Sequence, residues 1–522
     1  MTARTIRTLG LILLFAVVLR VPYLLHTLQD MDEGCYAGAA AVLMDGGLPY
    51  RDAVENKPPG IFYVYRAAFE LFGKYNMRAV HGVTLAWTLL TAAVLGLLTL
   101  GLGGRLAALC AFFFYLVFTA SLYPKMIAAN GEIFMALPYA LGAFLLFHAF
   151  TRDRRALYFA AGLAFGFAPL FKQVGAVGGA AVLVFLVALP LFGRGARIGR
   201  TVGSAFLFGA GFVLPAGAVA LLFHRAGILD DWVFWNLTYP SRYIQSGNAA
   251  LPFFPQLLAE FLPFVMSTVL LWALAALWVR REAGRWRPGG GGGFSAFLLL
   301  WLAASAGATL LGSRMFGHYF IQILPPLCLV AALCAGRRLA EGSPGRRRAW
   351  KGAILALTLI PGLVFAGMGV FFEASTDTWW RPEPDFRPAA EYIRNHTGPD
   401  DTVFVWGWFT PVYVYAERTP ATRFMNTHLL TGYRKGNDPD ERDRADIAWR
   451  AVPEAWPMLE EDLANNRVDL VVDTSPGDYH DFGRYPIRDY APLAGYLDDA
   501  CRLEKQIAGM DIYRCGEDRE KP

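Results

Sequence analysis

The sequence has little charge and few cysteines for its length. Only 17% of its 522 residues are charged, whereas a soluble globular protein carries roughly a quarter. Six cysteines in so long a chain exclude a small disulfide-stabilised scaffold. The net charge of +5 is modest and its basic residues gather in a few loops, so nucleic-acid binding is not indicated. These shortages exclude an ordinary soluble protein.

The sequence is instead rich in long apolar runs. About 20 consecutive apolar residues span a bilayer, and such runs recur from residue 9 to residue 373. The runs do not alternate with period 2, which excludes transmembrane β-strands. The sequence therefore predicts a polytopic α-helical membrane protein with about 11 transmembrane helices. The expected spans are 8–28, 79–101, 105–121, 133–150, 156–170, 174–192, 202–223, 261–279, 294–312, 320–336 and 352–373.

Basic residues predict the orientation of these spans. They recur in every second loop, and cytoplasmic loops carry such an excess of lysine and arginine. We therefore expect a multi-pass protein of the plasma (inner) membrane, with its N-terminus in the cytoplasm and its C-terminus outside. The loops expected in the cytoplasm include those that hold Arg154, Arg197, Arg285 and Arg347.

The composition changes near residue 373. Residues 1–373 hold every expected span, and residues 374–522 have the composition of a soluble domain. In this second part, 386–396 is typical of an amphipathic helix, and hydrophobic runs such as 402–408 and 468–474 are typical of buried strands. CRLEKQI and MDIYRC are two further strand-like pieces. We expect an extracytoplasmic α/β domain, and a disulfide between its Cys501 and Cys515 is left open.

The first outside loop, residues 29–78, concentrates ionisable side chains. QDMDEGCY places Asp30, Asp32 and Glu33 directly after the first span, and YRDAVENKPPG adds Glu55 and Lys57. A lone acid at such a place is most often a solvated helix end. Carboxylates and a lysine together at a membrane boundary could instead perform acid-base chemistry on a polar group that a lipid presents. Later in the same loop, the amphipathic stretch 61–73 is expected to lie in the membrane interface.

These motifs resemble a known family. The succession Asp-Glu-x-x-Tyr, Gly-x-x-Pro-Tyr-x-Asp and Asn-Lys-Pro-Pro-Gly within residues 32–60 is similar to bacterial glycosyltransferase family 39. This family belongs to the C-type glycosyltransferase superfamily and includes protein O-mannosyltransferases and lipid A aminoarabinose transferases. KQVGA (172–176), SRMFGHYFIQILPP (313–326) and VFVWGWFTPVYVYAERTPATRF (403–424) are also similar to the bacterial members. The resemblance thus covers most of the chain.

The resemblance implies that residues 1–373 form a transmembrane glycosyltransferase domain. Such enzymes move a sugar, with inversion, from a polyprenyl-phosphate donor to an acceptor hydroxyl on the outer face, and their acceptors are lipids, glycans or proteins. Asp32 stands at the position of the family's general base, with Glu33 as the second catalytic candidate. A carboxylate that takes the hydroxyl proton strengthens the nucleophile, and cations stabilise the leaving phosphate. The sequence leaves the sugar and the acceptor open.

Cationic and polar residues at the expected outer boundary are the candidates for binding the donor phosphate. A single lysine or arginine at a boundary more often extends toward lipid headgroups. Arg314 and His318 are stronger as a pair, because they could converge from one short loop. The candidates are Lys57, Lys172, Arg314, His318 and Tyr319.

Glu55 and Glu132 are the candidates for binding a divalent metal ion or the acceptor. The aminoarabinose transferases have Glu directly before Lys-Pro, whereas Asn56 stands there in this chain, so a metal role for Glu55 is doubtful. Glu132 is equally typical of an acid at a helix N-terminus. Arg20 lies inside the first span, where a charge is costly and tends to be paired or functional. We expect it to have a structural role or to pair with an acid of the site rather than to contact substrate.

Two other classes compete with an enzyme. A transporter or flippase of lipid-linked sugars would carry ionisable residues at mid-membrane and paired broken helices, but here the charge lies at one boundary and no internal repeat is visible. A non-catalytic receptor would leave the acids and the lysine of the first outside loop unexplained.

Overall fold

The computed structural model describes residues 3–123, 125–192, 198–240, 257–283, 293–310, 316–371, 384–433 and 447–516. It divides into two compact units. The first, the helical unit, comprises Met1–His26, His81–Leu222 and Pro252–Glu373. The second, the outer unit, comprises Thr27–Val80, Phe223–Leu251 and Ala374–Pro522. The first outside loop therefore groups with the C-terminal residues, which a boundary drawn at residue 373 along the sequence does not anticipate.

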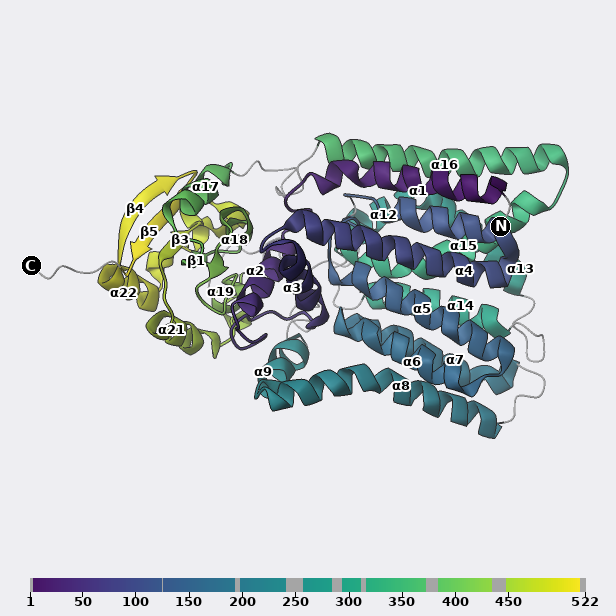
Figure 1. Cartoon of the computed structure of the whole chain (residues 1–522), viewed down its shortest axis with the longest axis horizontal. Coiled ribbons are helices and arrows are strands. Elements are labelled where there is room, and N and C mark those ends of the chain that lie inside the picture. Colours follow the sequence, from purple (N-terminus) through teal and green to yellow (C-terminus); the bar gives the residue numbers. More distant parts are fainter. Residues whose placement is uncertain are drawn as a thin grey trace, which may run out of the picture. The chain divides into compact units, whose positions relative to one another are not determined.

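Long apolar helices build the helical unit (Figure 1). Eight helical segments of the described chain are long and apolar enough to cross a membrane, by length and composition. The helices in these segments are α1 Ala3–Leu24, α4 Met77–Phe118, α5 Gly131–Arg152, α7 Ala176–Phe192, α8 Ile198–Arg225, α14 Gly293–Leu310, α15 Leu324–Ala340 and α16 Pro344–Phe371. Three shorter helices accompany them, α6 Arg155–Phe167, α12 Leu262–Ser267 and α13 Val269–Glu282. The expectation of a multi-pass helical membrane protein is confirmed, and the count of 11 spans stays a prediction.

Helix α4 is a hairpin of two helices. Gly104 interrupts it with a φ of 79°, in the left-handed region that favours glycine. A Cβ atom on Gly96 would lie 3.5 Å from the carbonyl oxygen of Ala108, although 12 residues of straight α-helix would separate the two by roughly 18 Å. The chain therefore reverses at Gly104, between the expected spans 79–101 and 105–121.

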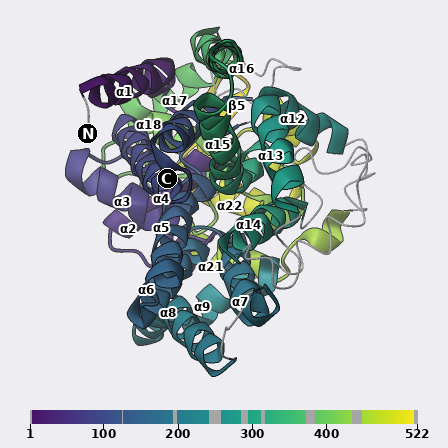
Figure 2. The same ribbon diagram turned by 90° about the vertical axis from the view of Figure 1, so that its right-hand side faces the viewer.

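Burial separates the centre of the helical unit from its lipid-facing side. Helix α15 is buried without interruption from Leu324 to Ala332. In contrast, Leu14 on α1, Phe206 on α8 and Leu363 on α16 are 62%, 74% and 62% exposed. Helix α1 packs beside α16 (Figure 1), and Figure 2 shows the bundle from another side. Large apolar side chains on outward faces are expected where the surrounding solvent is lipid.

A five-stranded mixed sheet forms the core of the outer unit, with strand order β2-β1-β3-β5-β4. Strands β2, β1 and β3 are parallel, whereas β5 is antiparallel to both β3 and β4. The expected helix and the four expected strands are all present, and a disulfide joins Cys501 to Cys515. The strands are β1 Thr402–Trp406, β2 Thr419–Pro420, β3 Leu470–Asp473, β4 Cys501–Ile507 and β5 Met510–Cys515, and the helices are α17 Arg387–His396, α18 Pro411–Ala416, α19 His428–Thr431, α21 Ala455–Asn465 and α22 Ala491–Ala500.

The first outside loop contributes two helices to the outer unit, α2 Asp32–Met44 and α3 Gly60–Phe72. Helix α3 is the expected amphipathic stretch, whereas α2 was not anticipated. The loop is tied to the sheet by backbone and side-chain hydrogen bonds. The Val54 N–H donates to the Arg423 carbonyl at 2.8 Å, and the Tyr75 hydroxyl donates to the Arg418 carbonyl at 2.6 Å. The loop is therefore an integral part of this unit.

Candidate active site

Asp32 is the first residue of helix α2 and lies beside the ring of Tyr36. One turn later in the helix, the Tyr36 hydroxyl donates a hydrogen bond to Oδ2 of Asp32 at 3.4 Å. Asp32 is half-buried, so its carboxylate combines a fixed position with access from outside. That combination is what a general base requires.

The two neighbouring acids are more deeply buried than Asp32. Glu33 is 0% exposed, and its Oε2 accepts a hydrogen bond from the Gln29 N–H at 2.9 Å. Asp30 is 5% exposed, and its Oδ1 lies 3.5 Å from the Asp32 nitrogen, the outer limit for a hydrogen bond. Both acids thus brace the backbone that leads into α2, and of the three acids Asp32 is the most accessible.

The sheet of the outer unit holds the beginning of α2. The Thr410 hydroxyl, in the loop after β1, donates to the Met31 carbonyl at 3.2 Å. Gly34 packs so closely on the same residue that an added Cβ would lie 2.9 Å from the Cβ of Thr410. The Asn426 amide donates to the Cys35 sulfur at 3.3 Å. Sequence reasoning did not assign roles to Thr410 and Asn426, although the first lies in the stretch 403–424 that carries part of the family resemblance.

Glu55 and Lys57 form a second ionic group in the outer unit. Nζ of Lys57 lies 3.6 Å from Oε1 of Glu55 and 3.1 Å from Oδ1 of Asn56. The Tyr50 hydroxyl donates to the Lys57 carbonyl at 2.8 Å, which fixes the backbone before the two prolines. Asn56 therefore contributes to holding the lysine, although it stands where the aminoarabinose transferases have Glu.

The pKa of the Cys35 thiol is affected by acids of both groups. Burial raises the pKa of its thiol well above the ordinary value, and the negative charges of Glu55 and Asp32 raise it further. Both carboxylates therefore lie within electrostatic range of one side chain. Asp32, Glu33, Glu55 and Lys57 all belong to the outer unit, and their common role in one site stays a prediction.

A second cluster of predicted residues lies in the helical unit. Nζ of Lys172 is 2.8 Å from Oε1 of Glu132, the second residue of α5. Nε2 of His318 is 4.0 Å from the same oxygen. Nζ of Lys172 also lies over the Tyr319 ring, 4.8 Å from its centre. Four residues from three distant segments of the sequence therefore form one largely buried ionic cluster, Glu132, Lys172, His318 and Tyr319, which we call the Lys172 cluster.

Irregular backbone positions the Lys172 cluster. Lys172 is an extended residue between two 3₁₀ turns, Ala168–Leu170 and Gln173–Gly175, so the chain is not helical where the lysine leaves it. Gly131 permits the approach to α5, because a Cβ there would overlap the carbonyl oxygen of Phe171. His318 and Tyr319 belong to a 3₁₀ helix, Gly317–Ile323, that leads into α15.

Two predicted residues stand apart from these clusters. Arg314 lies outside the described residues. Arg20 is buried in α1, and its guanidinium donates to the Thr119 hydroxyl at 2.8 Å and to the Ala16 carbonyl at 3.2 Å. In the part of the chain that the structure describes, its hydrogen-bond partners are thus neutral oxygens, and the expected acid partner is not among them. Its hydrogen bonds join α1 to the end of α4, which is a structural role.

Neither candidate metal ligand belongs to a suitable ligand set. Within the described ranges, no three His, Cys, Asp or Glu side chains come together to hold a metal ion. Glu132 already faces the Lys172 ammonium, and Glu55 faces that of Lys57. A carboxylate neutralised by a lysine is a poor ligand for a divalent cation.

Comparison with known proteins found one matching family model and several solved structures with a similar fold. The family model described as dolichyl-phosphate-mannose-protein mannosyltransferase matches residues 56–213. The search of curated proteins found no match. ArnT from Cupriavidus metallidurans bound to undecaprenyl phosphate is structurally similar, with a TM-score of 0.60 and 14% identity over 97% of this chain and 98% of that one. The archaeal oligosaccharyltransferase AglB from Archaeoglobus fulgidus, in complex with an inhibitory peptide and a dolichol-phosphate, has a TM-score of 0.57 and 14% identity over 100% of this chain and 75% of its own.

These findings agree with the motifs of the first outside loop. The matched residues 56–213 begin inside that loop and continue through α3 to α8. The structural similarity extends over nearly the whole chain. The family model over residues 56–213 and the membrane fold shared with ArnT and AglB both agree with the resemblance of the loop motifs to glycosyltransferase family 39.

Proposed function

We propose that this membrane glycosyltransferase moves a hexosyl or pentosyl group from a polyprenyl-phosphate donor to an acceptor hydroxyl on the outer face of the plasma membrane, with inversion. The observation that carries the proposal is the environment of Asp32. Asp32 is an accessible carboxylate, fixed at the beginning of α2 and flanked by two buried acids. The undecaprenyl phosphate bound to ArnT and the dolichol-phosphate bound to AglB support a lipid-phosphate donor.

Asp32 is assigned to the acceptor half of the reaction. In this half, its carboxylate takes the proton of the acceptor hydroxyl while the oxygen attacks the anomeric carbon of the sugar. The Tyr36 hydroxyl keeps the carboxylate in one orientation. Glu33, which accepts from a backbone N–H and is fully buried, is assigned to positioning.

Cationic side chains are assigned to the leaving polyprenyl phosphate. As the bond to the sugar breaks, negative charge grows on the phosphate oxygens, and a preorganised cation stabilises it. Lys57, Lys172 and His318 are the candidates in the described part of the chain, and Arg314 remains a candidate outside it. The acceptor is a lipid, a glycan or a protein, and Glu55 and Glu132 orient the lysines that they contact.

The test is transfer by the purified protein in lipid nanodiscs. The donors are undecaprenyl-phosphate-linked hexoses and pentoses, and the acceptors are glycolipids from a strain that lacks the gene. Asp32→Asn keeps the shape of the side chain but removes the proton acceptor, so turnover should fall by a factor on the order of 10²–10⁴. Donor binding should change much less.

Asp30→Asn is the matched control, because it removes a neighbouring acid by the same chemical change. Its effect on turnover should be far smaller. Near-normal turnover of Asp32→Asn together with an inactive Asp30→Asn would show that the assignment of the base to Asp32 is wrong. Movement of the intact lipid-linked sugar across the bilayer without any transfer would favour a flippase instead.

A further inference from the structure

A cavity rich in arginine lies in the helical unit among the ends of several helices, and none of the residues assigned above lines it. It has a volume of about 850 Å³. The wall comes from the ends of α13 and α15, the beginnings of α14 and α16 and the turn of the α4 hairpin. Its charged lining residues are Arg280, Arg281, Glu282, Arg337, Arg338, Glu341 and Arg346, and the thiol of Cys334 also lines it.

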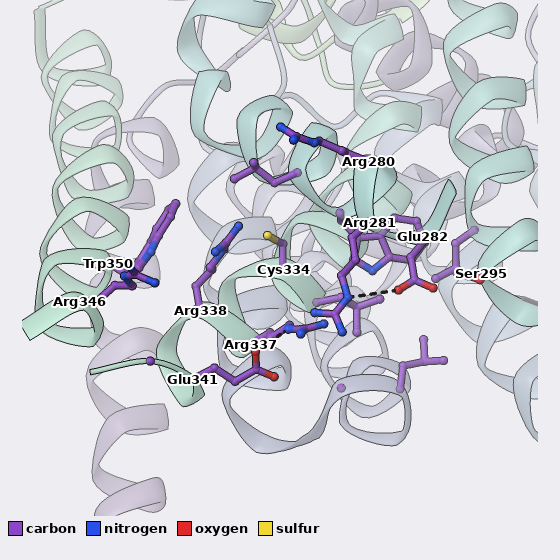
Figure 3. A pocket seen from close by; sticks show the side chains of 17 residues that line it. Arg280, Arg281, Glu282, Ser295, Cys334, Arg337, Arg338, Glu341, Arg346 and Trp350 are labelled. Atoms are coloured by element: carbon purple, nitrogen blue, oxygen red, sulfur yellow. Dashed lines mark hydrogen bonds and ion pairs between the residues drawn. The ribbon is translucent and has the colours of Figure 1, made fainter. Parts of the chain in front are cut away.

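The charge of this cavity is strongly positive. Five arginines face two glutamates, which gives a net charge of +3. Nε of Arg281 lies 3.9 Å from Oε1 of Glu282, and Nε of Arg337 lies 2.7 Å from Oε2 of Glu341. Figure 3 shows Arg281 beside Glu282, with Arg337 and Arg338 extending from α15. In the described part of the chain, Arg280, Arg338 and Arg346 form no ion pair with a carboxylate, so the cavity has positive charge to offer an anion.

A tryptophan orients one of these cations. The guanidinium of Arg338 lies over the Trp350 ring, 5.3 Å from its centre. This cation–π contact restrains the side chain without using its N–H groups. A guanidinium held in this way presents a planar fork that matches two oxygens of one phosphate group.

Part of the cavity wall is apolar. Leu102, Leu277, Leu298 and Leu333 line it together with the buried Trp278. A soluble anion needs only the arginines and would gain nothing from this surface. A lipid needs both, because its headgroup is anionic and its glycerol backbone and upper acyl chains are apolar.

We infer that this cavity binds the phosphodiester headgroup of an anionic glycerophospholipid. Arg338 and Arg346 contact the phosphate oxygens, and the leucines contact the first carbons of the acyl chains. The site is independent of the transfer reaction and of its polyprenyl-phosphate donor. The arginines come from the loops that the sequence predicts to be cytoplasmic, where anionic lipid headgroups attract basic side chains.

Lipid binding to the purified full-length protein tests the inference. Native mass spectrometry would follow the titration of the detergent-solubilised protein with phosphatidylglycerol, with cardiolipin and with zwitterionic phosphatidylethanolamine. The pocket variant is Arg338→Gln with Arg346→Gln. We expect it to bind the two anionic lipids at least tenfold more weakly, since each basic residue near an anionic surface contributes about 1 kcal/mol, a factor of roughly five.

The chain offers a matched control for the lost charge. Arg347→Gln with Arg348→Gln also removes two arginines, both exposed and both in the first turns of α16, and neither residue lines the cavity. This variant should bind the lipids within twofold of the wild type. A third variant, Arg338→Lys with Arg346→Lys, keeps the charge but loses the planar forks, and it should show an intermediate loss.

Three outcomes would overturn the inference. The first is an equal loss of lipid binding in the pocket variant and in its control, which would indicate attraction to the general positive charge. The second is binding of phosphatidylethanolamine as tight as that of phosphatidylglycerol. The third is displacement of the bound lipid by millimolar glycerol 3-phosphate, which would identify a site for soluble phosphates. A pocket variant that unfolds would be replaced by Leu298→Phe, which narrows the apolar wall and should weaken lipid binding without loss of charge.

Discussion

Nζ of Lys172 and Oε1 of Glu132 lie 2.8 Å apart, and the two side chains are only 9% and 1% exposed. Each charge is therefore neutralised mainly by the other, in surroundings poor in water. Removal of one partner leaves a buried charge without its neighbour, which commonly costs 3–5 kcal/mol, whereas replacement of both can be nearly neutral.

A double-mutant cycle on this pair is the first prediction. Lys172→Met and Glu132→Gln should each lower the thermal stability of the protein in detergent, and the double variant should be more stable than Lys172→Met alone. Transfer should remain slow in the double variant if the lysine also serves the donor phosphate. Additive losses of stability in the double variant would contradict a direct interaction between the two charges.

The second prediction concerns the contact that places Asp32. Gly34→Ala pushes a methyl group against Thr410, so α2 must shift and the carboxylate moves with it. A displacement of about 1 Å at a catalytic group can cost a factor of 10². We expect kcat to fall while the KM for the donor changes little. Adding Thr410→Ala, which removes the opposing hydroxyl and methyl groups, should restore part of kcat; no restoration would mean that the contact does not act through position.

The third prediction is a pH dependence of the outer unit. Burial raises the pKa of the Asp473 carboxyl at the end of β3 to about 6, compared with about 4 in an unfolded chain. The folded state therefore holds this proton more tightly. The resulting stabilisation is fully present below about pH 4 and is lost as the pH rises through about 6, with a magnitude on the order of 2 kcal/mol.

Hydrogen exchange of the β1 and β3 amides, corrected for the intrinsic effect of pH, measures this change. Protection should decrease between pH 5 and pH 7 in the wild type. Asp473→Asn cannot ionise, so its protection should be nearly independent of pH over the same range. A wild-type protein with flat protection would show that the carboxyl titrates alike in the folded and unfolded states.

The fourth prediction is the orientation in the membrane. The four free cysteines Cys35, Cys110, Cys328 and Cys334 are buried, and Cys501 and Cys515 form a disulfide, so a new exposed cysteine can be labelled over a low background. Glu391→Cys in the outer unit should react with an impermeant maleimide in intact cells. Arg347→Cys, which is expected in the cytoplasm, should react only after the inner face is opened. The reverse pattern would refute the outward-facing reaction.

Hydrophobic runs and turn residues were enough to predict most of the fold. Backbone groups in lipid are satisfied only in α-helices or closed barrels, and apolar segments without period-2 alternation fit only the helix. Gly104 reverses the chain where the sequence separates two spans, and the strand-like pieces 402–408 and CRLEKQI became β1 and β4. In these places local composition and the final structure agree, because few alternatives bury the same residues.

The missed features depend on contacts between distant segments. Helix α2 was not anticipated because DEGCYAGAAAVLM has no strong amphipathic pattern, and its small residues suit a helix buried on nearly all sides. The hydrogen bond from Thr410 to Met31 joins residues 379 positions apart, which no local pattern records. The alternative that Arg20 pairs with an acid failed for a similar reason. Its guanidinium donates instead to the hydroxyl of Thr119, which directly follows α4.

The grouping of residues 27–80 with residues 374–522 has a consequence for how the enzyme is made. Asp32 leaves the ribosome among the first residues, whereas Thr410, which fixes the backbone beside it, is synthesised 379 residues after Met31. At about 5–20 residues per second, the interval is roughly 20–75 s. During that time the helices can enter the bilayer while α2 still lacks the sheet on which it packs. If Asp32 is the base, as proposed, transfer can begin only after the C-terminal residues have folded against α2.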